Sequence, residues 1–541
     1  MSAAAALGAA PFAASPRGRL SRVRCDEKVG RRRNFSVGHP TDLHSSSSSS
    51  SSKGFGRSSV RVTSRLRVTA VAAGAAASAS SAVAPTDGRS QADFDALWAW
   101  LESNGADVRN VAPKLMDAAP GGRGWGLVAV KDLGKGETAL SVPKSLWMTA
   151  ETAAASPVGP FCEGQLPWVG VAMQLLHERA AGAKSKWAAY VATLPAVLDA
   201  PLFWTSEQLA EIEGTQLFTN AAGYDSYVRG TYGALASSVM AANPSVFPED
   251  VFTEEAFLWA FGILRSRALP PVDQGDGIAL VPGLDLANHS GLSSATWTLN
   301  NGGLGSVFGG GAKEAMLLRT EKTAGLDAGA ELFTNYGVAK IDSQFALDYG
   351  FTDEFCARPG YVLGPIAIPE TDVNKYDKVD VLELAGLLEE PAFTVRAFED
   401  PPPELRVFMR LLNLQGEDAF LLEAIFRQEA WGLISEPVSE QNEQMVCTTM
   451  INGCEDALSA YPTRTEEDRA AAETATDPRS KLAARVRMGE KQALTEVLGY
   501  FAGVETKLAQ MEYYQERRLR SLNLLDKDGN STYDPFNETM A

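Results

Sequence analysis

The chain has 541 residues, of which 45% are apolar, so it is long enough to bury two globular cores and still carry appendages. Its formal net charge is −18, but residues 1–85 hold 13 of the 49 basic residues and three of the 67 acidic ones, which leaves about −28 on the remainder. Because a body that acidic repels DNA and anionic membranes, we expect neither nucleic acid nor a membrane as its partner.

Cysteine and histidine are scarce. The five cysteines lie far apart and include no Cys-x-x-Cys pair, so the sequence indicates neither a disulfide framework nor a zinc cluster and fits a reducing compartment. Two of the four histidines lie in the N-terminal segment, which leaves His177 and His289 for the body. These are too few for a histidine-rich metal site, and we expect no metal cofactor.

The N-terminal segment, residues 1–80, is rich in Ala, Ser and Arg, poor in acids and without a sustained apolar period. This composition is typical of an organelle transit peptide, and we expect a disordered plastid one that is cleaved near its end. A disordered tail that stays attached is the alternative. No later stretch reaches the length of a membrane span.

Globular patterns begin after this segment. Apolar residues at helical spacing predict a short helix over 94–101, and residues 126–142 indicate two short strands around a glycine turn. Helical periods predict a helical block at about 150–268. Strand patterns return at 278–281 and 315–319.

The remaining segments are a loop, a helical region and a tail. The glycine-rich stretch 301–311 is expected to be a solvent loop, and the chain is expected to be almost wholly helical after about residue 370. An apolar stripe over 494–508 predicts one long amphipathic helix whose stripe belongs to a core. The polar tail 525–541 is expected to be flexible, and its glycine falls too early for a calcium loop.

A glycine-rich run, GRGWGLVA at 122–129, is the first candidate for chemistry. Read from Gly124 it fits the G-x-G-x-x-A dinucleotide fingerprint, which needs a strand before it and a helix after it. A strand follows the run here, so the dinucleotide interpretation fails. What remains is a backbone that a ligand can approach closely or, as the alternative, an ordinary loop before a strand.

Two further runs carry polar residues among apolar ones. LVPGLDLANHS covers 280–290, and ELFTNYG covers 331–337, followed by YGF at 349–351. A lone histidine in such a run is more often a hydrogen-bonded structural residue than a base. Each tyrosine, taken alone, is more often a packed core residue than a catalyst.

Together and in this order, the three runs resemble the SET domain of protein methyltransferases, with its glycine-rich first strand, Asn-His-Ser pseudoknot segment and terminal Tyr-Gly. FLWAFGILRSRA (257–268) and FALDYGF (345–351) are similar to the Rubisco large-subunit lysine methyltransferase family. AYPTRTEED (460–468) and LAARVRMGEK (482–491) resemble its C-terminal lobe. The resemblance covers nearly all of residues 90–520.

The resemblance implies an α+β fold. We expect a β-rich SET domain with a pseudoknot over 90–365, which contains the helical insertion, and an all-α substrate-binding lobe over 370–524. It implies a monomeric protein-lysine N-methyltransferase that uses S-adenosylmethionine. The expected acceptor is a protein of the plastid stroma that docks on the helical lobe, such as Rubisco large subunit or fructose-bisphosphate aldolase.

The resemblance also implies roles for single residues. Tyr336 corresponds to the catalytic tyrosine, and Tyr349 shapes the lysine channel. Arg267 and Asp285 line the pocket shared by cofactor and substrate, where an arginine can bind a carboxylate through two hydrogen bonds. The residues expected to bind the cofactor are Arg123, Gly124, Trp125, Asn288 and His289.

Two positions depart from the family pattern. Trp125 stands where a smaller apolar residue is usual, and Leu269-Pro270-Pro271 replaces an aromatic and basic continuation, so that a basic contact to the substrate is missing. The cysteine cluster of many histone methyltransferases is absent, which argues against chromatin. Two alternatives stay open: the same fold acting on a histidine acceptor, and a catalytically silent protein-binding scaffold.

Overall fold

The computed structural model describes residues 88–117, 124–270, 277–301, 314–353, 356–526 and 529–532. The expected transit segment at 1–80, all of the expected loop at 301–311 except Asn301, and the tail beyond Thr532 lie outside this part of the chain. In the part that is described, no helix combines the length and the apolar character that crossing a membrane requires.

The first half of the described chain is built on short strands. They are β1 (Val111–Asp117), β2 (Gly124–Ala129), β3 (Thr138–Pro143), β4 (Met148–Thr149), β5 (Ala279–Leu280), β6 (Asn288–His289), β7 (Ala295–Asn300), β8 (Ala315–Thr320) and β9 (Glu331–Thr334). They form a sheet in the order β1-β2-β9-β6, a second sheet in the order β3-β8-β7, and the pair β4-β5. The strands predicted at 126–142, 278–281 and 315–319 are confirmed.

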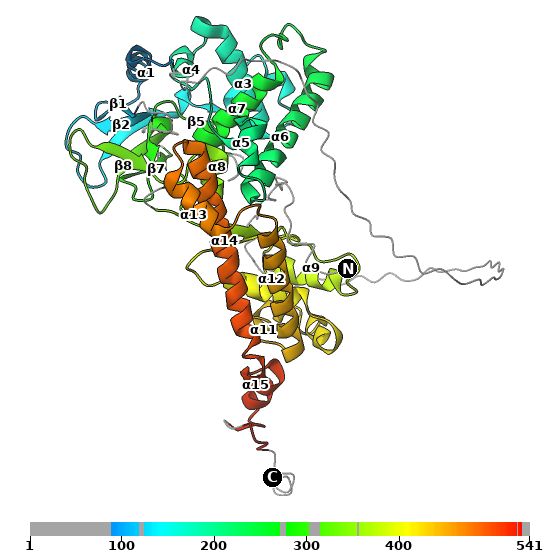
Figure 1. The fold of residues 1–541 in the computed structure, drawn as a ribbon. Coiled ribbons are helices and arrows are strands. Elements are labelled where there is room, and N and C mark those ends of the chain that lie inside the picture. Colours follow the sequence, from blue (N-terminus) through cyan, green and yellow to red (C-terminus); the bar gives the residue numbers. More distant parts are fainter. Residues whose placement is uncertain are drawn as a thin grey trace, which may run out of the picture. The chain divides into compact units, whose positions relative to one another are not determined.

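Helices precede and interrupt these strands. They are α1 (Gln91–Ser103), α2 (Ala150–Ala154), α3 (Pro167–Ala181), α4 (Ala188–Ala192), α5 (Ser206–Ala210), α6 (Gln216–Leu235), α7 (Glu254–Arg267) and α8 (Asp342–Tyr349). Helices α2 to α7 form the helical block predicted at about 150–268, and Figure 1 shows α3 to α7 grouped beside the strands.

Helix α7 lies at the centre of the first hydrophobic core. Every residue from Phe257 to Leu264 is buried, and α3 packs against this helix. A helix that is apolar on all sides belongs in an interior, where each large side chain contributes about 1.5–3 kcal/mol of burial free energy. Because the core fixes α7, the charged side chains at its end are held in place, Arg265 against Asp348 of α8 and Arg267 against Asp285.

The second half of the described chain has its own hydrophobic core, between Tyr361 and Tyr514. Its elements are β10 (Gly360–Leu363), α9 (Lys375–Leu384), β11 (Phe393–Arg396), α10 (Pro403–Leu412), α11 (Ala430–Leu433), α12 (Glu440–Ser459), α13 (Thr465–Thr474), α14 (Pro478–Glu505) and α15 (Tyr514–Ser521).

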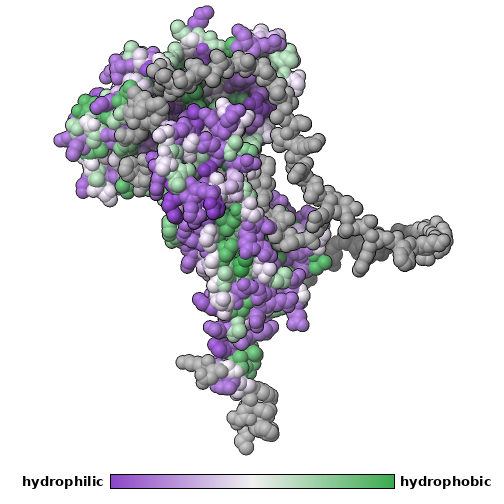
Figure 2. All heavy atoms as spheres, in the orientation of Figure 1, coloured by the Kyte–Doolittle hydropathy of each residue, from purple (hydrophilic) through white to green (hydrophobic). Residues whose placement is uncertain are grey.

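The second half is helical as expected, with one exception. Strand β11 pairs antiparallel with β10, because its sequence FTVR alternates buried and half-buried residues and favours an extended chain. The apolar stripe predicted over 494–508 lies on α14, which ends at Glu505, so Leu508 falls in the following turn. Figure 2 shows a mainly hydrophilic visible face, on which apolar side chains gather only locally.

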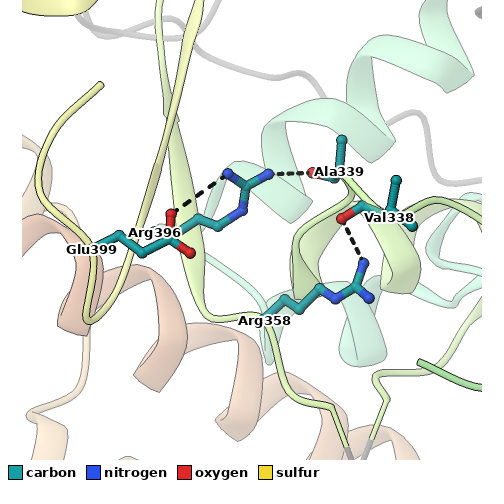
Figure 3. Close-up of a pocket in the computed structure, with 5 residues that line it drawn as sticks. All are labelled: Val338, Ala339, Arg358, Arg396 and Glu399. Atoms are coloured by element: carbon teal, nitrogen blue, oxygen red, sulfur yellow. Dashed lines mark hydrogen bonds and ion pairs between the residues drawn. The ribbon is translucent and has the colours of Figure 1, made fainter. Parts of the chain in front are cut away.

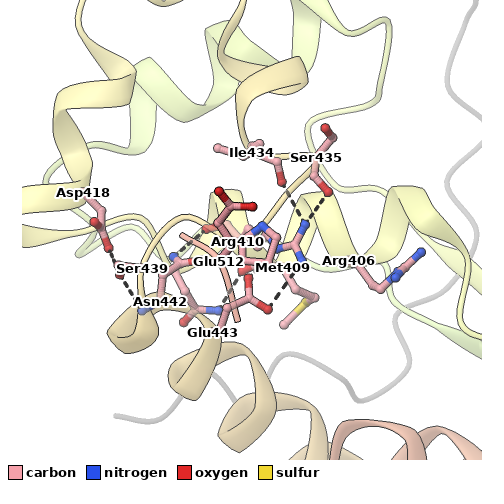
Figure 4. A network of polar contacts seen from close by, with 12 residues as sticks. Arg406, Met409, Arg410, Asp418, Ile434, Ser435, Ser439, Asn442, Glu443 and Glu512 are labelled. Atoms are coloured by element: carbon pink, nitrogen blue, oxygen red, sulfur yellow. Dashed lines mark hydrogen bonds and ion pairs between the residues drawn. The ribbon is translucent and has the colours of Figure 1, made fainter. Parts of the chain in front are cut away.

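An ion pair holds α10 and α12 together inside this core. The Arg410 guanidinium binds the Glu443 carboxylate, and it also donates to the backbone carbonyls of Ile434 and Ser435 (Figure 4). The Asn442 amide donates to the Arg410 carbonyl across 3.1 Å. Both charged side chains are less than 10% exposed, so neither charge has water as a substitute partner.

Helix α14 also reaches the first half of the chain. Its first turns pack Leu482 and Val486 against Leu217 of α6 and Leu347 of α8. One turn further, the buried Glu490 accepts hydrogen bonds from the Gln216 backbone N–H at 3.1 Å and from the Tyr461 hydroxyl at 2.6 Å. Helix α8, which carries Tyr349, and the helical region therefore share one helix as a common support.

The Glu443→Gln substitution tests the buried pair. It leaves the Arg410 charge buried without a countercharge, so we expect the free energy of unfolding in urea to fall by about 3 kcal/mol. The matched control is Glu370→Gln, which removes the carboxylate of an exposed pair with Lys375 and should leave the unfolding midpoint unchanged. Equal midpoints for both variants would contradict a structural role for the buried pair.

Glu490 predicts a pH-dependent stability. Burial raises the pKa of Glu490 from 4.5 to about 7. Because the folded chain binds the proton more tightly than the unfolded chain, this stabilisation is complete below pH 4.5 and is lost as the pH rises through 7. Relative to Glu490→Gln, the wild type should lose about 3 kcal/mol over this range in urea unfolding experiments. Parallel pH profiles for the two proteins would contradict the prediction.

Candidate active site

The glycine-rich run forms β2 and leaves part of its backbone open. Gly124 has φ +64°, and a Cβ at this position would meet no atom of the described residues within 4 Å. A Cβ built at Gly126 would lie 2.6 Å from Glu331 Oε1 and 2.7 Å from Asn288 Nδ2. Glycine at 126 is therefore needed for these two side chains to meet over the strand, whereas Gly124 leaves room for a ligand.

Trp125 points into the protein between the two glycines. Its ring stacks on Phe94 with centroids 3.9 Å apart, and the residue is 7% exposed. The unusual size of Trp125 is thus taken up by the core, and only its backbone faces the site. Arg123, the first residue expected to bind the cofactor, lies outside the described residues.

Strand β6 brings the Asn-His run next to β2 and β9. It runs parallel to β9, with Asn288 opposite Phe333 and His289 opposite Thr334. The Asn288 amide donates to Glu331 Oε1 at 2.8 Å and to the Trp125 carbonyl at 3.3 Å. One side chain therefore ties together the three strands β2, β6 and β9.

Tyr336 follows β9 and is held from two sides. Its backbone N–H donates to His289 Nδ1 at 3.1 Å, and its hydroxyl donates to the Ala287 carbonyl at 2.9 Å. Burial, followed by the neighbouring Tyr349, raises the pKa of the Tyr336 phenol well above its ordinary value. The hydroxyl therefore stays protonated at neutral pH and acts as a hydrogen-bonding group rather than as a phenolate base.

His289 supports the tyrosine loop. Burial lowers the pKa of this histidine, so the ring is neutral at pH 7, with Nδ1 as the acceptor for Tyr336. Its ring packs on Phe345 and Phe351 at centroid distances of 4.6 and 5.7 Å. The Nε2 atom lies 3.3 Å from Asp353 Oδ2, outside hydrogen-bonding geometry. The His289 side chain thus positions the backbone of Tyr336 and does not act as a general base.

Tyr349 ends α8 and faces Tyr336. The two rings lie 4.7 Å apart, and the helix stops there because Gly350 takes a left-handed φ of +76°. The Lys340 ammonium lies 4.9 Å from the Tyr349 ring centroid and 2.5 Å from Asp348 Oδ2. Asp348 also binds Arg265, at 2.6 Å.

A second polar group holds the segment before β6. Arg267 Nη1 lies 3.2 Å from Asp285 Oδ2, to which Tyr190 also donates at 2.8 Å. Arg267 and Asp285, both expected to line the shared pocket, are thus brought together, and the carboxylate that Arg267 binds in this structure is that of Asp285. Ala287, the acceptor for Tyr336, lies two residues further on.

The structure thus gathers all the described site residues predicted from sequence around β2, β6 and the end of β9. No motif in the sequence indicated the polar residues that support this site. They are Tyr190, Arg265, Glu331, Lys340 and Asp348. A charged residue inside an apolar run, such as Glu331 in ELFT, is the signal that could have indicated them.

Leu269, which begins the segment that departs from the family pattern, contributes to a sheet through its backbone. Its backbone exchanges two hydrogen bonds with Ala279, at 2.8 and 3.1 Å, so the segment extends the sheet at β5. Pro271 lies outside the described residues.

The described residues that are expected to bind S-adenosylmethionine lie close together. A Cβ at Gly124 would meet no atom of the described residues within 4 Å, and the Asn288 amide donates to the carbonyl of the next residue, Trp125. Within the described ranges, no three His, Cys, Asp or Glu side chains gather where they could hold a metal ion.

Comparison with known proteins identifies two parts of this architecture. The family model described as Rubisco LSMT substrate-binding matches residues 369–494, within the helical second half. The solved SET domain of LSMT bound to lysine and AdoHcy superposes with a TM-score of 0.70 at 33% identity, covering 81% of this chain and 97% of that one.

Two curated relatives match most of the chain. The chloroplastic ribulose-1,5 bisphosphate carboxylase/oxygenase large subunit N-methyltransferase of Nicotiana tabacum is 36% identical, over 82% of this chain and 88% of its own length. The chloroplastic fructose-bisphosphate aldolase lysine N-methyltransferase of Arabidopsis thaliana is 35% identical, over 80% of this chain and 88% of its own length. Both names support the plastid location expected from the N-terminal composition.

The fold and the site define the class of this protein: it is an S-adenosylmethionine-dependent methyltransferase with a SET fold. Within this class, the chain belongs to the family of Rubisco large-subunit lysine methyltransferases.

Gly126→Ala tests the contact that organises the site. The added Cβ would displace Asn288 and Glu331, so we expect S-adenosylmethionine binding, measured by calorimetry, to weaken at least tenfold. Stability should fall by about 1–3 kcal/mol. The matched control is Gly230→Ala in α6, where a Cβ meets no atom within 4 Å and alanine favours the helix. Wild-type affinity in Gly126→Ala would disprove the assignment of this strand to the cofactor.

Proposed function

We propose that this protein transfers a methyl group from S-adenosylmethionine to the ε-amine of a lysine in a protein of the plastid stroma. The observation that carries the proposal is the placement of Tyr336: its hydroxyl is fixed on the Ala287 carbonyl, between the Asn288 strand and the ring of Tyr349. When bound, S-adenosylmethionine supplies a methyl group on a sulfonium centre. Gly124, Trp125 and Asn288 would hold it through backbone and amide groups.

The aromatic side chains prepare the acceptor amine. A lysine amine is mostly protonated in water, where its pKa is about 10.4, and only the neutral form can attack. Tyr336, Tyr349 and Phe351 lie within 6.4 Å of one another, ring to ring, and offer few charges to hold an ammonium. Transfer of the amine from water into these surroundings lowers its pKa and favours the reactive form.

Tyr336 then acts by position rather than as a base. Its phenol keeps its proton because burial raises its pKa. The neutral hydroxyl can therefore hydrogen-bond the Ala287 carbonyl and orient the amine without becoming a phenolate. Near-attack positioning of this kind can lower a barrier by about 7–11 kcal/mol. Arg267 and Asp285 keep the Ala287 segment in place, and His289 keeps the backbone of Tyr336 in place.

The acceptor is a stromal protein that docks on residues 369–494, the segment that resembles the substrate-binding model. Rubisco large subunit and fructose-bisphosphate aldolase are the candidates, because the relatives are named for these acceptors. The prediction that the enzyme works as a monomer belongs to the same proposal. The acidic body of the chain supports a protein rather than a nucleic acid as the partner.

Tyr336→Phe tests the proposal. The full chain is incubated with radiolabelled S-adenosylmethionine and a stromal extract, and the labelled protein is hydrolysed to identify the methylated amino acid. We expect methyl-lysine in a protein of the size of Rubisco large subunit or aldolase, formed about a hundredfold more slowly by the variant. S-adenosylmethionine affinity should change little, because the hydroxyl binds a backbone carbonyl of the protein.

Tyr232→Phe is the matched control. Its hydroxyl also donates to a backbone carbonyl, that of Phe252 at 2.9 Å, but away from the site, so activity should stay at the wild-type level. Label in histidine would support the histidine acceptor instead. Absence of both label and S-adenosylmethionine binding would support the scaffold.

A further inference from the structure

A hollow of about 460 Å³ lies next to the tyrosine loop, outside the residues assigned above. Its lining consists of Val338, Ala339, Arg358, Arg396 and Glu399 (Figure 3). Three of these residues belong to the SET half, while Arg396 and Glu399 belong to the segment that matches the substrate-binding model. We call it the arginine hollow.

The pairing of β10 with β11 brings the two arginines together. Gly360, two residues after Arg358, lies opposite Arg396 in the register. Arg358 Nη1 donates to the carbonyls of Gly337 and Val338 at 2.9 and 2.8 Å, and Arg396 Nη2 donates to the Ala339 carbonyl at 2.8 Å. Both guanidinium groups are thereby fixed on the loop that follows Tyr336.

Most N–H groups of these two arginines have no hydrogen-bond partner among the described residues, since each guanidinium carries five donors. The Glu399 carboxylate is 3.9 Å from Arg396, too far for a hydrogen bond, and its side chain is 63% exposed. The hollow thus has more positive than negative charge on a chain whose formal net charge is −18. Fixed, open guanidinium groups are suited to a carboxylate.

The hollow also lies close to Tyr336, since Val338 and Ala339 of its lining follow that residue in the chain. Gly337 and Val338 directly follow Tyr336, and the Val338 side chain is 78% exposed. Ala339, which binds Arg396, is three residues after Tyr336, so the Cα atoms of Tyr336 and Ala339 are at most about 11 Å apart. An extended acceptor segment of five residues, about 17 Å long at 3.3–3.6 Å per residue, is long enough to span such a distance.

We propose that the arginine hollow binds a carboxylate of the protein acceptor, located within about five residues of the target lysine. The proposal rests on the function proposed above and adds to it a rule of acceptor choice. The carboxylate comes from an Asp or Glu side chain or from the C-terminus of the acceptor. Arg396 is then a specificity-determining residue that acts on the binding of the acceptor and leaves the cofactor untouched.

A peptide series tests the proposal with the full chain. Each peptide has eleven residues, one central lysine in a Gly-Ser background, and either Glu or Gln at one of the ten other positions. A second series ends one to five residues after the lysine, with either a free or an amidated C-terminus. Methyl transfer from radiolabelled S-adenosylmethionine gives kcat and KM for each peptide.

We expect one position or one chain length at which the carboxylate peptide has a kcat/KM about tenfold above its amide, mainly through KM, as for one charge-assisted hydrogen bond. In Arg396→Gln this ratio should fall to about one, while turnover of the amide peptide and S-adenosylmethionine affinity stay unchanged. Arg396→Glu puts a carboxylate in the hollow. This variant should therefore prefer a further peptide, in which arginine takes the place of the Glu, over the Glu peptide itself. The series that responds identifies the source of the carboxylate.

Arg464→Gln is the charge-matched control, since it removes one positive charge from a side chain that is 79% exposed just before α13, and it should keep the wild-type ratio. Ratios near one for every wild-type peptide, or an unchanged ratio in Arg396→Gln, would overturn the proposal. A loss of S-adenosylmethionine affinity in Arg396→Gln would do so as well, because it would assign the hollow to the cofactor. If Arg396→Gln does not fold, Arg396→Lys keeps the charge without the planar fork and should lower the ratio partly.

Failure of the proposed function gives a different result. In that case neither the stromal extract nor any peptide is labelled, and calorimetry detects no S-adenosylmethionine binding. If the extract is labelled but the peptides are not, fluorescence polarisation of the same peptides, labelled with fluorescein, replaces turnover as the readout. Tighter binding of the carboxylate peptide that is lost in Arg396→Gln then supports the arginine hollow, and equal binding overturns it.

Discussion

The site depends on the parallel pairing of β6 with β9, which joins Asn288 to Phe333 and His289 to Thr334. Parallel strands cannot be joined by a tight turn, and here the intervening chain forms β7 and β8 before it returns. The pairing puts the Asn288 amide over Gly126 of β2 and the His289 ring under the backbone of Tyr336. Three runs that are far apart in the sequence thus meet at one place.

The charges around the reacting centre are nearly all compensated within the protein. Arg267 is paired with Asp285, and Asp348 binds both Arg265 and Lys340. The histidine is neutral, and the Tyr336 phenol keeps its proton because burial disfavours its anion. The described residues of this site include no strong base, so we attribute its effect on the reaction to the alignment of an amine in apolar surroundings and to fixed dipoles. In the arginine hollow, by contrast, most guanidinium N–H groups have no hydrogen-bond partner among the described residues.

The sequence by itself determined the class of fold and the residues at the centre of the site. The apolar periods placed α1, α7 and α14, because burial of one helix face or of a whole helix leaves a regular spacing. The order of the three runs indicated the SET fold and identified Tyr336, Asn288 and Tyr349. It also identified Arg267 and Asp285 as neighbours, although they are 18 residues apart. These assignments depend on local patterns and on their order, both of which can be read in one dimension.

Only the tertiary structure decided which polar groups support the site and which guanidinium N–H groups near it lack a hydrogen-bond partner among the described residues. Glu331 meets Asn288, and Tyr190 meets Asp285, through contacts that span 43 and 95 residues of sequence. Trp125 looked like an obstacle to the cofactor, yet stacking on Phe94 turns its side chain into the core. The physical reason is common to these two contacts and to the stacking of Trp125. Whether a side chain faces a partner, the core or water depends on strand register and on packing between distant segments, and neither produces a regular spacing in the sequence.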